Sequence, residues 1–211
     1  MEKIVFASKK QIAHLRAFLK GAKMFDALRT LNLVEDTYGS DLRKDGKTLS
    51  VTHPVQIALS VLMLPLNEVY KENAIVLSLL HDMVEDYNLS LHVMNELYGT
   101  DNASKYYEYT CQLSKVVGNE KKDNVTYFAG LTHYLTVLVK GLDRLNNLNS
   151  MVGCFTVAKM TEQVEETKAF VLPMLKTGER KYPEVELALY AIRHQMIQVL
   201  NLLQEIIKKD K

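Results

Sequence analysis

Apolar residues recur at helical spacing along nearly the whole chain. Near the N-terminus the stripe consists of Ile12, Leu15, Phe18 and Leu19. The same pattern returns in residues 53–64, 72–87, 90–99, 133–148 and 185–207. Apolar positions three and four residues apart share one face of an α-helix, so each of these segments is predicted to be helical.

Three segments interrupt the helical pattern and are predicted to be loops: residues 36–52, 118–123 and 176–183. The chain has only nine glycines and four prolines, and no Asn-Gly or Asp-Gly hairpin stands between two alternating runs. We therefore predict an all-α fold.

The length of 211 residues suits one helical domain, and no linker or internal repeat divides it. We expect a single domain over residues 1–211, with its motifs within 40–176. The C-terminal helices, residues 183–209, are expected to pack on that core, with homodimerisation as the alternative use of their apolar face.

The composition narrows the classes of partner. The net charge is +1, which gives no bulk attraction to nucleic acid or to a membrane. There is no leader-like start and no apolar run of the roughly 18 residues that a membrane helix needs. Two cysteines are too few for a disulfide framework and are expected to be buried. We expect a soluble, cytoplasmic protein.

One short stretch, LLHDMVEDY at residues 79–87, puts polar groups inside an apolar segment: His81, Asp82, Glu85 and Asp86. On a single helix these four side chains would share one polar sector. Three adjacent carboxylates repel one another unless a positive group neutralises them. A solvated helix end leaves unexplained why a histidine and an acid directly follow a run that should be buried. A bound divalent cation explains it.

A metal needs ligands from further elements. His53 stands directly before a proline that can begin a helix. Asp143, Arg144, Asn146 and Asn147 lie at the end of another apolar segment. The spacing alone does not select His53 and Asp143 from six histidines and many acids.

The order of His53, then His81 with Asp82, then Asp143 resembles the HD metal-dependent phosphohydrolase superfamily. LLHDMVEDY is similar to the LLHDvvED signature of the RelA/SpoT-type hydrolase domains, which cleave the alarmone ppGpp. RKDG before HP, and VKGLDRLNNL, resemble that family's RKsG…HP and iKlaDRlhNm segments. EETKAFVLPML, residues 165–175, resembles its ET…yaPLa helix.

The resemblance implies an HD-domain helical bundle with a metal site between helices. The matching metal ligands are His53, His81, Asp82 and Asp143. Mn²⁺ is the family's usual ion, and another divalent ion is the alternative. Glu85 and Asp86 match the acidic pair that handles the attacking water and the leaving oxygen.

The same resemblance implies a nucleotide substrate. The residues that match its substrate contacts are Arg43 and Lys44, near the phosphates, and Arg144 and Asn147, near the nucleotide. The implied activity removes the 3′-pyrophosphate of ppGpp or pppGpp, with Glu85 as general acid or base. Because 211 residues leave no room for a synthetase domain, we expect a stand-alone small alarmone hydrolase.

The chain departs from the family around the substrate. Thr48 and Leu49 replace a Gly-x-Pro-Tyr stretch, and Asn146 stands where a histidine is common. Thr126 and Tyr127 stand where an Arg-Lys pair is expected. These departures keep two alternatives open: a phosphohydrolase of another nucleotide (ppApp, NADPH or a nucleoside monophosphate), or a non-catalytic nucleotide-binding protein.

Overall fold

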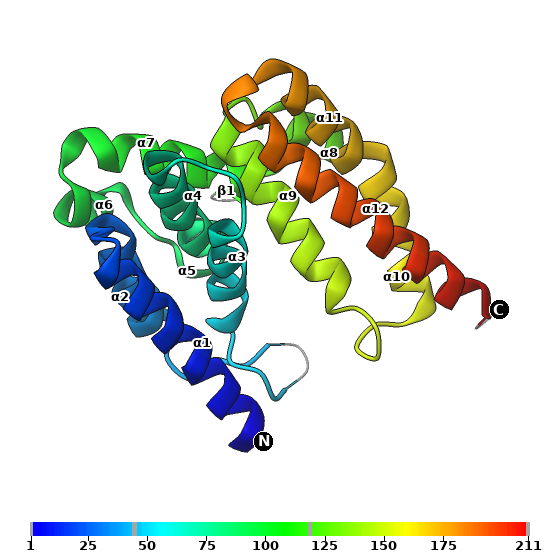
Figure 1. Cartoon of the computed structure of the whole chain (residues 1–211), viewed down its shortest axis with the longest axis horizontal. Coiled ribbons are helices and arrows are strands. Elements are labelled where there is room, and N and C mark those ends of the chain that lie inside the picture. Colours follow the sequence, from blue (N-terminus) through cyan, green and yellow to red (C-terminus); the bar gives the residue numbers. More distant parts are fainter. Residues whose placement is uncertain (1, 44–45, 118–119, 210–211) are drawn as a thin grey trace. The chain divides into compact units, whose positions relative to one another are not determined.

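The computed structural model describes residues 2–43, 46–117 and 120–209, and these residues form two compact units. The first unit contains Met1–Met63 and Asn67–Lys122, and the second contains Leu64–Leu66 and Asp123–Lys211. Helices account for nearly all of the described secondary structure (Figure 1), so the prediction of an all-α fold is confirmed. A single domain over residues 1–211 remains a prediction.

The first unit is built from seven helices and a short hairpin among the residues that the structure describes. In chain order they are α1 (Glu2–Gly21), α2 (Phe25–Tyr38), α3 (Thr52–Leu62), α4 (Glu68–Leu80), α5 (Met83–Tyr87), α6 (Leu91–Tyr98), α7 (Thr100–Leu113), β1 (Val116–Val117) and β2 (Glu120–Lys121). Helix α4 packs against α2, α3 and α7, and α5 packs against α7 and β1. This arrangement holds α5 against fixed neighbours.

Helix α4 is the central helix of this unit. The side chain of its N-cap residue Asn67 accepts a hydrogen bond from the Tyr70 amide at 2.9 Å, which satisfies one free donor of the first turn. Every residue from Ala74 to Leu80 is buried. A helix that is apolar on all sides must be surrounded by other elements, and α4 brings His81 into that interior at its C-terminal end.

The second unit contains α8 (Asn124–Ala129), α9 (Tyr134–Asn149), α10 (Val157–Glu166), the π-helical turn η1 (Thr167–Val171), α11 (Leu172–Lys181), the 3₁₀ turn η2 (Pro183–Val185) and α12 (Glu186–Lys209). Helix α12 packs against α9, α10 and α11. A Cβ atom added at Gly141 of α9 would lie 2.8 Å from Leu175 Cδ2 and 3.1 Å from Ile192 Cγ2. Glycine therefore permits the close approach of α9 to α11 and α12.

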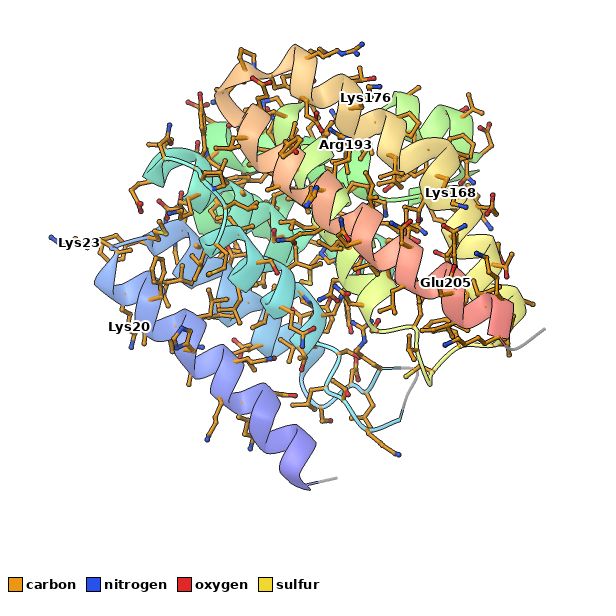
Figure 2. The ribbon with its side chains drawn as sticks, turned by 45° about the vertical axis from the view of Figure 1, so that its right-hand side comes forward. Lys20, Lys23, Lys168, Lys176, Arg193 and Glu205 are labelled. Carbon is orange, nitrogen blue, oxygen red and sulfur yellow. The ribbon has the colours of Figure 1, made fainter. Side chains whose placement is uncertain are left out.

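Charged side chains lie on the outer surface of this unit beside exposed apolar ones such as Leu187 and Leu202. Figure 2 labels Arg193 and Glu205 on α12, and Lys168 in the π-helical turn η1. Arg193 pairs with Glu179 of α11, and Lys168 pairs with Glu165 at 3.1 Å. The predicted C-terminal helix is thus present as α12, with its apolar side on its own unit.

Two of the loop predictions need correction. Residues 176–181 continue α11, which ends at Lys181 before Pro183. Around the predicted loop at 118–123, Val116–Val117 pairs antiparallel with Glu120–Lys121. The cysteines are not both buried: Cys111 is half-buried and Cys154 is exposed. Among the described residues, no helix combines the length and the apolar character needed to cross a membrane.

Candidate functional site

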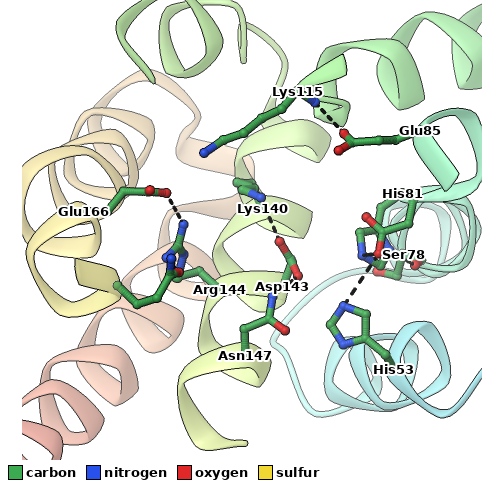
Figure 3. A network of polar contacts seen from close by, with 12 residues as sticks. His53, Ser78, His81, Glu85, Lys115, Lys140, Asp143, Arg144, Asn147 and Glu166 are labelled. Carbon is green, nitrogen blue, oxygen red and sulfur yellow. Dashed lines mark hydrogen bonds and ion pairs between the residues drawn. The ribbon is translucent and has the colours of Figure 1, made fainter. Parts of the chain in front are cut away.

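Three of the predicted metal ligands lie together in the first unit. His53 is in the first turn of α3, His81 follows α4, and Asp82 precedes α5. A ligand nitrogen of His53 and one of His81 lie within 4.8 Å of each other. Asp82 Oδ2 lies 3.0 Å from His81 Nε2 and 3.9 Å from His53 Nε2. Figure 3 shows the two histidines close to each other.

The ring of His81 is held in one orientation by its own helix. Its Nδ1 atom lies 2.8 Å from the carbonyl oxygen of Ser78. A carbonyl oxygen only accepts, so Nδ1 carries the hydrogen and donates. Nε2 then turns toward Asp82, either as the N–H of an imidazolium or as a lone pair that can bind a cation.

This donor set fits a divalent metal ion. Both imidazoles are buried, and two imidazole nitrogens and a carboxylate oxygen suit borderline ions such as Mn²⁺ or Zn²⁺. A histidine ligand commonly donates its other ring N–H to a backbone carbonyl, as His81 does to Ser78. Asp82 keeps about two fifths of its side chain exposed, at 39%, so the cluster is open to solvent on the side of the carboxylate.

The chain bends within the motif instead of continuing as one helix. Helix α4 ends at Leu80 and α5 begins at Met83, so the prediction that His81, Asp82, Glu85 and Asp86 share a sector of one continuous helix is wrong. The His81 ring donates a hydrogen bond to the carbonyl oxygen of Ser78, which is one of the last carbonyls of α4 and has no partner in its own helix. The bend separates the two ligands from the two acids that follow.

Glu85 and Asp86 stand on α5 in different surroundings. Glu85 Oε2 accepts hydrogen bonds from the backbone amides of Lys115, at 2.7 Å, and Val116, at 3.4 Å. The pKa of Asp86 is raised, first by burial and then by the carboxylates of Asp82 and Glu85. The pair therefore combines a carboxylate fixed by the hairpin with a carboxyl that holds its proton more strongly than usual.

Arg43, predicted to lie near the substrate phosphates, belongs to the loop between α2 and α3. Its amide donates to the Thr48 carbonyl oxygen at 2.8 Å. Lys44, predicted to share this role, lies outside the described residues. At the base of the same loop, Asp41 Oδ2 accepts a hydrogen bond from the Tyr87 hydroxyl at 3.1 Å.

Asp143, the remaining predicted ligand, is a buried residue of α9 in the second unit. Lys140 Nζ lies 2.8 Å from its Oδ2, and Asn147 Nδ2 lies 2.7 Å from its Oδ1. Burial by itself would lower the pKa of Lys140, but the charge and hydrogen bond of Asp143, together with Tyr127, outweigh burial and raise it. Asp143 is thus held as an anion between two donors of its own helix, and its membership of the metal site stays a prediction.

Arg144, predicted to face the nucleotide, is buried in the second unit. Its guanidinium pairs with Glu166 (Figure 3) and also donates to Gln163, and both partners are on α10. Only 6% of its side chain is exposed. In this arrangement the guanidinium joins α9 to α10.

Two residues with polar roles escaped the sequence analysis, Lys140 and Tyr87. Lys140 stands three residues before Asp143, a spacing that places both on one helix face and could have signalled the pair. Tyr87 directly follows the acidic pair, but its bond to Asp41 joins residues 46 positions apart and has no sequence signal. The amides that hold Glu85 carry none either, since every residue except proline has one.

No family model matches the chain. It is similar to a protein of Mycobacterium leprae (strain TN) named "Probable GTP pyrophosphokinase", with 24% identity over 167 residues. The matched part is 77% of this chain and 20% of that protein, so the chain corresponds to about a fifth of its relative's length.

Proposed function

We propose that the chain is a metal-dependent hydrolase that removes the 3′-pyrophosphate of guanosine tetra- or pentaphosphate. The observation that carries the proposal is the group formed by the buried His53 and His81 and the half-buried Asp82, followed on α5 by Glu85 and Asp86. The proposal also rests on the motif resemblance. The similarity to a protein named for pyrophosphate transfer to GTP supports the same class of nucleotide.

The proposed ligands of the ion are His53, His81, Asp82 and Asp143, and Mn²⁺ is the proposed ion. A bound divalent ion would lower the pKa of a water molecule and polarise a phosphoryl oxygen. The chain's contribution is to fix the donors beforehand: Ser78 orients His81, and Lys140 with Asn147 keeps Asp143 ionised and in place. Ligands that are already oriented lose less conformational freedom on binding.

In the proposed reaction the two acids of α5 divide the proton transfers. Glu85, held by two backbone amides, takes the proton of the water whose oxygen attacks phosphorus. As the bond between phosphorus and the 3′ oxygen breaks, Asp86 gives a proton to that oxygen. The raised pKa of Asp86 suits a group that must hold a proton for donation.

For the phosphates we propose Arg43 and Lys44, and for the nucleotide Asn147, which is half-buried beside Asp143. A guanidinium can bind two phosphate oxygens at once, which suits Arg43 to a pyrophosphate. We assign Arg144 instead to holding α9 against α10, since Glu166 and Gln163 already accept from it.

A second candidate function is hydrolysis of another nucleotide, such as ppApp, NADPH or a nucleoside monophosphate. The surroundings of Thr126 and Tyr127 favour it. Thr126 bonds Asp123 through both its amide and its hydroxyl, at 2.9 Å each. Tyr127 is buried, and its ring lies 5.3 Å from Lys140 Nζ. Neither residue provides the positive charge that the family has at these positions.

Turnover of a nucleotide panel with Mn²⁺ tests both candidates. Purified protein is incubated with ppGpp, pppGpp, ppApp, NADPH and nucleoside monophosphates, and the products are separated by ion exchange. Pyrophosphate release from ppGpp, lost in Glu85→Gln and retained in the surface variant His92→Ala, supports the proposal. If only another nucleotide were hydrolysed, the result would support the second candidate function instead. Metal binding without any turnover would indicate a nucleotide-binding protein.

A further inference from the structure

The loop between α2 and α3 has a defined shape on either side of residues 44–45. Leu42 and Leu49 form an antiparallel β-bridge. The Arg43 amide donates to Thr48 O at 2.8 Å, and the Ser50 amide donates to Asp41 O at 2.7 Å. Arg43 therefore stands on a small closed loop whose base is formed by Asp41 and Ser50.

The base of this loop is bonded to the last residue of the helix that carries the acidic pair. The hydroxyl of Tyr87, on α5, donates to Asp41 Oδ2 at 3.1 Å. The ring of Tyr87 also lies 4.5 Å from that of Tyr38, the buried last residue of α2, with an interplanar angle of 46°. A phenol bonded to a carboxylate and packed on a second ring is held in both position and direction.

Charged groups from the loop and from the acidic cluster both affect the pKa of the Tyr38 hydroxyl. Burial raises the pKa of its hydroxyl most, and the carboxylates of Asp82 and Asp86 raise it further. The guanidinium of Arg43 acts in the opposite direction on the same hydroxyl. The guanidinium of Arg43 and the two carboxylates are therefore each close enough to this hydroxyl to affect its pKa.

Tyr87 remains a hydrogen-bond donor throughout the pH range in which proteins work. Its pKa is raised to about 12, mainly by burial and by the bond to Asp41. The hydrogen bond from Tyr87 to Asp41 therefore does not depend on pH near neutrality.

We propose that Tyr87 is a positioning residue that ties the Arg43 loop to α5 and so places Arg43 for the pyrophosphate group of the substrate. The inference rests on the proposed function for the identity of the substrate, and on the described contacts for the tie. Without the hydroxyl, the loop loses its bond to α5 while Glu85 and Asp86 stay where α7 and β1 hold them. Substrate affinity then falls and the chemical step is preserved.

Tyr87→Phe removes one oxygen atom and keeps the ring, so it isolates the tie. Hydrogen exchange of the Arg43 and Ser50 amides should become faster in the variant, with α4 unchanged. KM for the nucleotide should rise about three- to tenfold, the range expected for the loss of one solvent-exposed hydrogen bond, with kcat within about twofold. Tyr190→Phe on the exposed face of α12 is the matched control and should change neither quantity.

Asp41→Ala removes the other partner of the bond and should reproduce the effect, with no further change in the double variant. Inorganic pyrophosphate, titrated calorimetrically, serves as a probe that needs no turnover, and its affinity should fall in Tyr87→Phe. Unchanged loop exchange or unchanged pyrophosphate affinity would overturn the inference. A wild-type protein that binds pyrophosphate through this loop yet cleaves no nucleotide would instead contradict the proposed function alone.

Discussion

The imidazole of His81 donates from Nδ1 to the carbonyl oxygen of Ser78 at 2.8 Å, three residues earlier on α4. One contact therefore closes the C-terminal end of a buried helix and fixes the direction of a predicted metal ligand. Because this hydrogen bond forms when α4 folds, His81 is already oriented before any ion binds. Folding and ligand placement depend on the same side chain here.

Metal binding should stabilise the protein through His81. At a metal concentration of about 100 times Kd, binding adds about 2.7 kcal/mol, which raises Tm by roughly 5–10 °C for a chain of this size. His81→Ala should abolish this rise when Tm is measured with and without Mn²⁺. His92→Ala, which alters an exposed histidine paired with Glu96, should retain it. If Mn²⁺ raised the Tm of His81→Ala as much as that of the wild type, His81 would not be a metal ligand.

Gly141→Ala should destabilise the second unit. The new Cβ would lie 2.8 Å from Leu175 Cδ2, and such overpacking costs about 1–3 kcal/mol. The higher helix propensity of alanine returns only about 1 kcal/mol. Gly21→Ala in α1 has no atom within 4 Å of its new Cβ and should be neutral or stabilising. Urea unfolding of the two variants compares these effects directly, and equal midpoints would show that α11 moves to accommodate the methyl group.

Glu166→Ala should cost far more stability than Glu165→Ala. Glu166 pairs with the buried Arg144, and removal of one partner of a buried pair costs about 3–5 kcal/mol. Glu165 is 65% exposed and pairs with Lys168 on the surface, where such pairs contribute about 0–1 kcal/mol. Thermal unfolding distinguishes the two variants. Similar small losses would mean that Arg144 is free to leave α10 and contact substrate, as the motif resemblance implies.

The sequence predicted the elements of this fold better than their ends. Helix α4 was predictable because its apolar run has helical spacing throughout. Its end at Leu80 was not, because the bend depends on a ring that bonds its own backbone. The continuation of α11 through Lys181 was missed because glycine and charged residues at 176–181 resemble a loop, while packing on α12 keeps them helical.

In the candidate site, too, the residues with a sequence motif were predictable and those placed by tertiary packing were not. His53, His81 and Asp82 were identifiable from motif order, and they come together within one unit. The role of Arg144 was not identifiable, because its partners Glu166 and Gln163 are about 20 residues away on another helix. Contacts of that kind depend on tertiary packing, which no local pattern encodes.

The final prediction concerns Asp86 and pH. Its folded-state pKa is raised by burial and by Asp82 and Glu85, so the folded protein holds this proton more tightly than the unfolded chain does. The resulting contribution to stability is complete below the unfolded pKa and is lost as pH rises through the folded pKa. In the absence of metal, Asp86→Asn should therefore melt at a higher temperature than the wild type above the ordinary aspartate range. The two Tm values should converge in acid.

Mn²⁺ should reduce the advantage of Asp86→Asn at neutral pH, because a nearby cation offsets the repulsion among Asp82, Glu85 and Asp86. Parallel melts with EDTA and with Mn²⁺, from acid to slightly alkaline pH, check both parts. Asp101→Asn, an exposed acid of α7, is the control and should show no metal-dependent change. If Mn²⁺ left the difference between wild type and Asp86→Asn unchanged, the ion would bind away from α5. The proposed proton transfers by Glu85 and Asp86 would then lose their basis, even if His81 proved to be a ligand.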